Sequence, residues 1–207
     1  MRNLKKILAL LMTGIMLVLA AGCGGGSSSN SSSGSGAKAP SNGKRVGVAM
    51  PTQSSQRWIQ DGANMKQKLE ALGYEVDLQY AEDDVQAQVS QIENMITNGA
   101  NCLVVASIDS SALVNALAQA KANNIPVIAY DRLLMDTDSV SYYATFDNKG
   151  VGTLIGKYVE KKLGLAEGKG PYNVEFFAGS PDDNNAHFLN DGLFEVLKPY
   201  IDKGQDR

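Results

Sequence analysis

The side chains best suited to bind a ligand lie in loops that follow predicted strands of this 207-residue sequence. Two of them follow the first apolar run, two come directly after a later run, and two lie in a polar loop at residues 179–185. The six candidates are Arg57, Trp58, Asp131, Arg132, Asp183 and Asn185. Because ligands of open parallel sheets bind at the carboxyl ends of the strands, we expect these loops to form one site.

The chemistry of these side chains suits an uncharged, polyhydroxylated ligand, such as a monosaccharide. Carboxylates accept hydrogen bonds from hydroxyl groups, arginine donates them in a planar fork, and asparagine does both. The indole of Trp58 could lie against the apolar face of a sugar ring. Each group also has a purely structural alternative. Trp58 fits the apolar stripe of a helix, Asp131 and Arg132 could form a cap and a surface ion pair, and residues 182–185 could simply cap a helix.

Other kinds of chemistry find little support in the sequence. His187 is the sole histidine, and no G-x-S-x-G segment accompanies it, so a serine hydrolase is a poor fit. No phosphate-binding loop follows a strand, and residues 136–138 lack the glycine and distal glutamate of a calcium loop. Glycoside hydrolysis by two carboxylates is the enzymatic alternative. We therefore expect a binding protein rather than an enzyme, with no cofactor and no bound metal.

An alternation of apolar runs and amphipathic helices predicts the scaffold for these loops. The predicted strands are residues 45–50, 74–80, 102–107 and 126–130, whose starts are 29, 28 and 24 residues apart. This spacing is about that of one strand–helix unit, so the fold class is α/β, with a parallel sheet covered by helices on both faces. Residues 74–80 alternate between polar and apolar, as in an edge strand. A helix with the stripe Trp58, Gly62, Met65, Leu69 and Leu72 follows the first strand.

The sequence beyond residue 141 predicts fewer strands. We expect strands at residues 142–146 and 173–178 and helices at 151–163 and 186–197. One strand beyond residue 148 cannot pair its own backbone groups. Apolar side chains of the two helices would then lack partners, namely Val151, Ile155, Phe188 and Leu193.

The first 43 residues are typical of a targeting signal followed by a flexible linker. A basic start and an apolar run form a signal peptide at residues 1–22, followed by Cys23 in a lipobox-like context. We expect Cys23 to be lipidated and residues 23–43, rich in Gly and Ser, to be a flexible linker. The only other cysteine, Cys102, would then be a buried free thiol. Beyond residue 22, 16 basic and 22 acidic residues give −6, which disfavours nucleic-acid binding.

Five segments together resemble the periplasmic-binding-protein type I superfamily, in its xylose-binding and multiple-sugar-binding branch of ABC transporter lipoproteins. The segments are residues 56–58, 91–96, 129–132, 146–148 and 179–186. The resemblance implies two Rossmann-like lobes that close on a sugar, the first at residues 44–147 and a partial second at 148–207. It places Arg57 and Trp58 in the first lobe, with Asp131 and Arg132 as an adjacent polar pair. Asp183 and Asn185 come from the second lobe, and Asp147 lies at a hinge crossing with a structural role.

The function that the resemblance implies is capture of a monosaccharide, such as xylose, glucose or galactose, for an ABC transporter permease. The protein would be a monomer, lipid-anchored to the membrane and extracytoplasmic, in the periplasm or on the outer face of the cytoplasmic membrane. A sensory module that presents the sugar to a chemoreceptor or sensor kinase is the alternative. Because chains of the family are longer, we expect this chain to be a fragment. We also expect residues 44–207 not to bind sugar with micromolar affinity.

Overall fold

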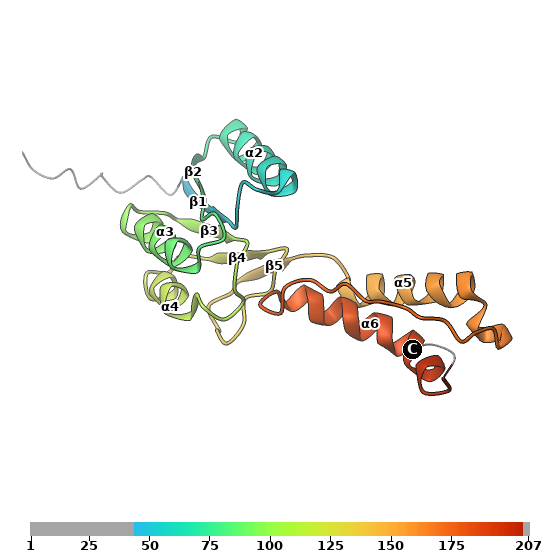
Figure 1. Cartoon of the computed structure of the whole chain (residues 1–207). Helices are drawn as coiled ribbons and strands as arrows, with labels where there is room; N and C mark the ends of the chain where they lie inside the picture. The colour runs from blue at the N-terminus through green and yellow to red at the C-terminus, as the bar shows by residue number, and fades with distance from the viewer. Residues whose placement is uncertain (1–43, 205–207) are drawn as a thin grey trace, which may run out of the picture. The chain divides into compact units, whose positions relative to one another are not determined.

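The computed structural model describes residues 44–204 (Figure 1). The predicted signal peptide, Cys23 and the linker lie outside the described residues. Within these residues, five parallel strands form one sheet in the order β2-β1-β3-β4-β5. They are β1 (Arg45–Met50), β2 (Glu75–Tyr80), β3 (Cys102–Val105), β4 (Val127–Tyr130) and β5 (Tyr142–Ala144). The α/β prediction is confirmed, and β2 lies at the edge that its alternating pattern predicted.

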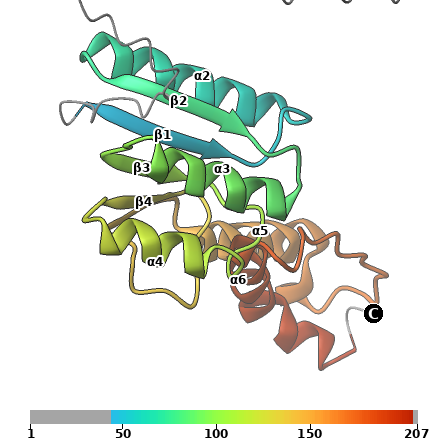
Figure 2. The same ribbon diagram turned by 90° about the vertical axis from the view of Figure 1, so that its left-hand side faces the viewer.

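Three helices cover the two faces of this sheet (Figure 2). They are α2 (Gln56–Ala71), α3 (Val85–Thr97) and α4 (Val114–Ala122). Side chains of α3 and α4, such as Ile92 and Leu117, pack with Leu103 and Val105 on one face. Trp58 of α2 packs with Val48 on the other. Strand β1 is buried at all six positions because it lies inside the sheet with helices on both faces.

Local sequence signals fix where these helices begin and end. Asp84 precedes α3, and its carboxylate accepts hydrogen bonds from Gln86 N at 2.8 Å and Ala87 N at 3.0 Å. Gly73 ends the turn after α2 with φ +86°, a conformation that favours glycine. The predicted stripe of α2 is one residue too long, because Leu72 lies past the helix end and is 73% exposed.

Two further helices, α5 (Asn148–Leu163) and α6 (Asn184–Ile201), lie side by side. A short 3-10 helix, η1 (Leu165–Glu167), follows α5. The helices approach through glycines: a Cβ on Gly192 would lie 2.8 Å from Thr153 N and closer still to the carbonyl oxygen of Lys149. Both helices begin at aspartate caps, Asp147 for α5 and Asp183 for α6. Asp147 therefore has the structural role that the sequence predicted.

The strand predicted at residues 173–178 is wrong. This segment is extended but belongs to no strand, and Phe177 is 92% exposed. Its composition suits a strand, but a strand forms only where a second backbone pairs with it, and within residues 44–204 none does so. As expected, Val151 and Ile155 of α5 lack full packing partners, with exposed fractions of 41% and 47%. Phe188 and Leu193 of α6, which were expected to lack partners too, are half-buried.

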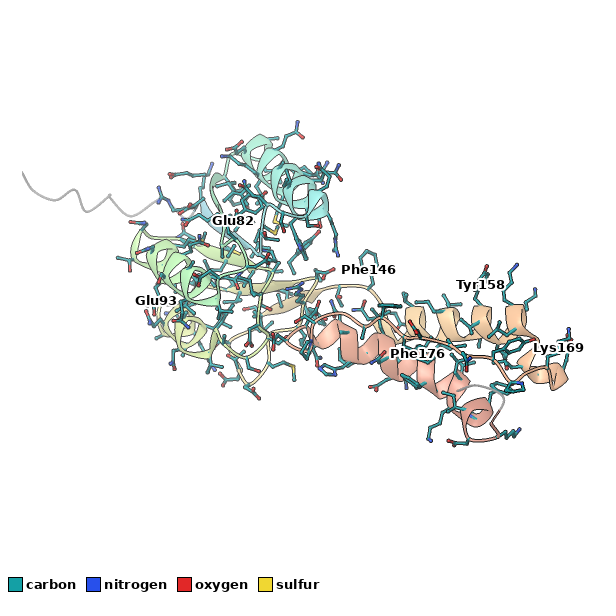
Figure 3. All side chains as sticks on the ribbon, viewed as in Figure 1. Glu82, Glu93, Phe146, Tyr158, Lys169 and Phe176 are labelled. Atoms are coloured by element: carbon teal, nitrogen blue, oxygen red, sulfur yellow. The ribbon has the colours of Figure 1, made fainter. Side chains whose placement is uncertain are left out.

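Several other features bear on the predictions. Phe146, at the connection from β5 to α5, and Tyr158 on α5 extend from the ribbon (Figure 3) and are largely exposed.

Cys102 is a free, half-buried thiol, and burial raises its pKa. Within residues 44–204, no helix has both the length and the hydropathy to cross a bilayer.

Candidate functional site

The structure brings the six predicted residues into one cluster. Arg57 and Trp58 lie in the first turn of α2, directly after the loop that follows β1. Asp131 and Arg132 follow the end of β4, while Asp183 precedes α6 as its cap and Asn185 lies in its first turn. The parallel sheet places the loops after β1 and β4 at the same edge, as the sequence predicted.

Asp131 is the centre of the cluster. Its Oδ2 atom lies 2.6 Å from a terminal nitrogen of Arg57, and its Oδ1 atom accepts a hydrogen bond from Asn185 at 3.2 Å. The residue has φ +63°, in the left-handed region that is costly for most side chains. Hydrogen bonds hold it there, from its own N–H to Ala144 O at 2.8 Å and from Thr145 Oγ1 to its carbonyl at 2.8 Å. The carboxylate is therefore both buried and fixed in direction.

Arg132 does not pair with its neighbour Asp131, contrary to the expected adjacent pair. Its Nε atom lies 3.0 Å from Asp183 Oδ2, an ion pair without hydrogen-bond alignment. Its Nη1 atom donates to the carbonyl of Ser107 at 2.8 Å. The left-handed backbone at Asp131 turns the chain at this point, so consecutive side chains reach different partners. Loss of Arg132 would therefore leave Asp183 unpaired, rather than Asp131.

Asp183 and Asn185 join the start of α6 to the rest of the cluster. Asp183 caps α6 by accepting a hydrogen bond from Asn185 N at 3.0 Å, and it also forms the ion pair with Arg132. The buried amide of Asn185 donates to both Asp131 O and Asp131 Oδ1. Its oxygen accepts from Asn148 Nδ2 at 2.9 Å and from Tyr143 Oη at 3.5 Å. These four bonds use the full hydrogen-bonding capacity of the amide.

Trp58 packs in the core and also carries the two arginines. It is only 7% exposed, within the cluster on the α2 face of the sheet. The guanidinium carbon of Arg57 lies 4.6 Å from the ring centroid, and that of Arg132 lies 5.4 Å away. Such contacts are favourable cation–π interactions. The structure thus favours the packing alternative for Trp58 over direct stacking on a ligand.

The electrostatics of the cluster are balanced by close pairs. Burial by itself would lower the pKa of Arg57, but the hydrogen bond to Asp131 and the charges of Asp131 and Asp61 raise it above its ordinary value. Desolvation raises the pKa of Tyr130, and the charge and hydrogen bond of Asp61 raise it further. Both groups are therefore protonated donors at neutral pH.

Sequence reasoning did not identify some residues that support the cluster. Ser110 ties the loop after β3 to α6, since its N–H and Oγ both donate to Asp182 O, at 3.2 and 2.9 Å. Asp61 contacts Arg57 one helical turn away, and Tyr130 contacts Asp61 from β4. The i to i+4 spacing of Arg57 and Asp61 was a usable signal, because such residues are neighbours on a helix. Nothing local in the sequence indicated the bond from Tyr130.

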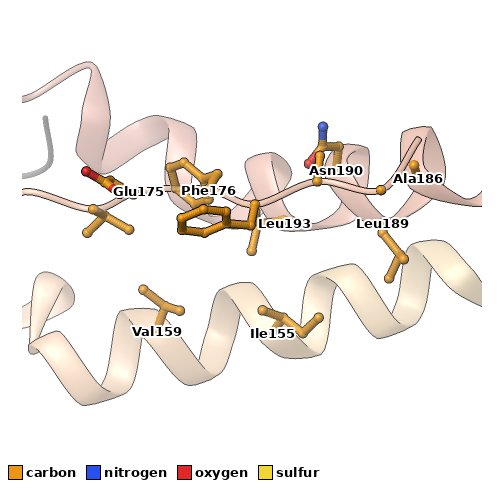
Figure 4. Close-up of a pocket in the computed structure, with 12 residues that line it drawn as sticks. Ile155, Val159, Glu175, Phe176, Ala186, Leu189, Asn190 and Leu193 are labelled. Carbon is orange, nitrogen blue, oxygen red and sulfur yellow. The ribbon is translucent and has the colours of Figure 1, made fainter. Parts of the chain in front are cut away.

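Two cavities differ sharply in their lining. One of about 210 Å³ adjoins the cluster and is lined by Arg57, Tyr130, Asp131, Ala144, Thr145 and Phe146. The other, of about 320 Å³, is an apolar groove between α5, α6 and residues 174–179 (Figure 4). Ile155, Val159 and Leu193 line it, beside the tilted ring pair of Phe176 and Phe194. Only the first cavity meets the charged residues of the cluster. Within residues 44–204, no three His, Cys, Asp or Glu side chains are grouped to hold a metal ion.

Comparison with known proteins assigns the chain to a family. A family model described as a periplasmic binding protein domain matches residues 46–205. The multiple sugar-binding periplasmic protein SbpA of Azospirillum brasilense is 55% identical over 160 residues, which cover 77% of this chain and 45% of that protein. The D-xylose-binding periplasmic protein of Escherichia coli strain K12 is 37% identical over 161 residues, or 78% of this chain and 47% of that protein.

A solved structure agrees with these relatives. An ABC transporter solute-binding protein from Clostridium phytofermentans, with bound β-D-glucose, is 60% identical with a TM-score of 0.78, over 79% of this chain and 51% of that chain. The chain spans about half the length of the relatives that it matches. The family model covers most of the chain, and the resemblance inferred from five short segments is confirmed. We conclude that the chain belongs to the periplasmic binding proteins, with the type I fold.

Proposed function

We propose that the protein captures a monosaccharide outside the cytoplasmic membrane and delivers it to an ABC transporter permease. The observation that carries this proposal is the cluster of Arg57, Asp131, Arg132 and Asp183 at the carboxyl edge of the sheet. Its members are held in place by protein hydrogen bonds before any ligand arrives. Such preorganisation reduces the entropy lost when a flexible set of side chains binds a ligand.

The donors and acceptors of the cluster complement a sugar without a charge of its own. Asp131 and Asp183 would accept hydrogen bonds from hydroxyl groups, while Arg57 and Arg132 would donate to hydroxyl oxygens. Hydrogen bonds to charged groups contribute about 1.5–3 kcal/mol each, more than neutral ones. Asn185 would exchange one of its four present bonds for a contact to the sugar. Trp58 would not contact the sugar but would support the guanidinium groups of Arg57 and Arg132, which lie over its ring.

The proposed domain organisation follows from the same cluster. We propose that residues 44–147 form the first lobe and that 148–207 belong to a second, so that the sugar lies between them. In support, residues 148–204 add no strand to the sheet, and they contact the first lobe through the start of α6. Bound sugar would strengthen this contact by adding hydrogen bonds on both sides of it.

Calorimetry on a chimera tests the proposal. Residues 46–205 of this chain replace the matching half of the glucose-bound Clostridium phytofermentans protein, which is 60% identical. We expect the chimera to bind glucose, and Asp131→Asn to weaken binding by at least about tenfold because it removes a charged acceptor. Asp77→Asn, on the edge strand β2, is the matched control and should leave the affinity unchanged. A chimera that folds like its parent but binds no monosaccharide would contradict the proposal.

Anchoring and the absence of turnover are further parts of the proposal. Cys23 would carry the lipid, and residues 23–43 would tether the binding lobes to the membrane surface. Cys23→Ser should abolish incorporation of radiolabelled fatty acid and release the protein from membranes. Sugar recovered from the protein should be chemically unchanged, whereas hydrolysis of a glycoside by the protein would support the enzymatic alternative.

A further inference from the structure

Asp61 connects the proposed sugar site to a residue on another element. It lies one helical turn after Arg57 on α2, and its Oδ2 atom is 3.3 Å from Arg57 Nε. The same oxygen accepts a hydrogen bond from the hydroxyl of Tyr130, at the end of β4, at 3.1 Å. The carboxylate therefore joins α2 to β4, rather than only pairing within its helix.

Arg57 is consequently held from three directions. Asp61 engages Nε, Asp131 engages one terminal nitrogen at 2.6 Å, and the ring of Trp58 lies 4.6 Å below the guanidinium carbon. Arginine carries five N–H donors in a fixed plane, so these contacts determine the direction of the donors that remain. Half of the Arg57 side chain is exposed, and without such contacts it would sample many rotamers.

A second ion pair on the same helix shows what an ordinary pair looks like. Lys66 and Glu70 also have the i to i+4 spacing, with Nζ and Oε1 3.8 Å apart. Exposed helix pairs of this kind contribute little to stability, because solvent screens them and both side chains lose rotamer freedom. Asp61 differs because it is less exposed than Glu70 and because Tyr130 fixes its orientation.

We propose that Asp61 and Tyr130 are positioning residues that set the orientation of Arg57 in the sugar site. They touch no ligand themselves and act through Arg57. This inference rests on the proposed function, and it assigns to the pair a part in distinguishing sugars that differ in the direction of one hydroxyl group. A guanidinium that cannot rotate binds only the hydroxyl oxygen that lies in its plane.

Acrylamide quenching of Trp58 in the full 207-residue chain tests the coupling without any sugar. Trp58 is the sole tryptophan of the chain, and Arg57 covers its ring. We expect Arg57→Ala to raise the quenching constant about twofold because it removes the covering group, and we expect Asp61→Ala to raise it to the same extent because the covering group then moves away. The double variant should match Arg57→Ala alone, since one residue acts through the other. Tyr130→Phe should shift the constant in the same direction, by less.

Glu70→Ala breaks the comparable pair on the same helix and should leave the quenching constant unchanged. Unchanged quenching in Asp61→Ala would overturn the inference, and so would additive effects in the double variant. In the chimera, Asp61→Ala should weaken glucose binding about tenfold, and add nothing in the Arg57→Ala background. A chimera that binds no sugar would refute the proposed function, while the quenching experiment would still decide the role of Asp61.

Discussion

The contact between α5 and α6 permits a sharp test of the packing. Gly192 on α6 faces the backbone of α5, where a Cβ would lie 2.8 Å from Thr153 N and closer still to Lys149 O. Both neighbours are backbone atoms, so neither can rotate away, and the helices must separate by roughly an ångström to restore normal contact. Gly192→Ala gains about 1 kcal/mol of helix propensity. Against this, overpacking costs about 1–3 kcal/mol, and a backbone clash is expected at the upper end.

Urea unfolding followed by circular dichroism measures the balance. We expect a net loss of about 2 kcal/mol, which at a slope of about 2 kcal/mol per molar lowers the midpoint by about 1 M. The control is Asp191→Ala, on the exposed face of α6 one residue earlier, which should remain within about 0.5 kcal/mol of the unchanged chain. A Gly192→Ala chain that is as stable as its parent, or more stable, would refute the close packing of the two helices.

Four other predictions follow from the site and the core. Arg132→Ala should weaken glucose binding by the chimera by about 2–4 kcal/mol in calorimetry, because it removes a charged donor and leaves Asp183 unpaired; unchanged affinity would make the pair purely structural. Burial raises the pKa of Cys102, which slows its reaction with iodoacetamide. In the Cys23→Ser variant, we expect alkylation of Cys102 to be at least about tenfold slower in the folded protein than in the protein unfolded in urea. Desolvation and a neighbouring carboxylate raise the pKa of Tyr130, so its contribution to the free energy of unfolding is complete below pH 10.0 and is lost as the pH rises through the folded-state value. The free energy of unfolding, measured with urea between pH 8 and 11, should therefore fall less steeply with rising pH for Tyr130→Phe than for the unchanged chain. Calorimetry on residues 44–207 alone should show no micromolar sugar binding, because within residues 44–204 no strand pairs with residues 173–178 to fix the loop that leads to Asp183; tight binding would contradict this.

The scaffold could be predicted from the sequence because its signals are local. Strand runs, the 3.6-residue periodicity of the helices and the cap at Asp84 each depend on a few neighbouring residues. The regular spacing of strands and helices then leaves few topologies for a parallel sheet. For the same reason the site residues near 57 and 131 could be found as loops at one edge of that sheet, whereas residue 183 reaches the site from the start of α6.

The remaining features depend on contacts between distant residues. The segment at 173–178 has the composition of a strand, but pairing is a property of a second segment and not of the first. Arg132 follows Asp131 in sequence, yet a left-handed residue sends the two side chains to different partners. The bond from Tyr130 to Asp61 spans 69 residues and has no periodic signal. Trp58 satisfied both a helix stripe and a ligand hypothesis, and only the packing distinguished them.

A crystal structure of the chimera with glucose would show where the sugar binds. We expect the sugar to lie against the carboxyl edge of the sheet, with hydroxyl groups within hydrogen-bond distance of Arg57, Asp131 and Arg132. We also expect Asp61 to contact Arg57 Nε when the sugar is bound. Glucose bound elsewhere, or bound near this edge without contact to these three side chains, would contradict the assignment of the site.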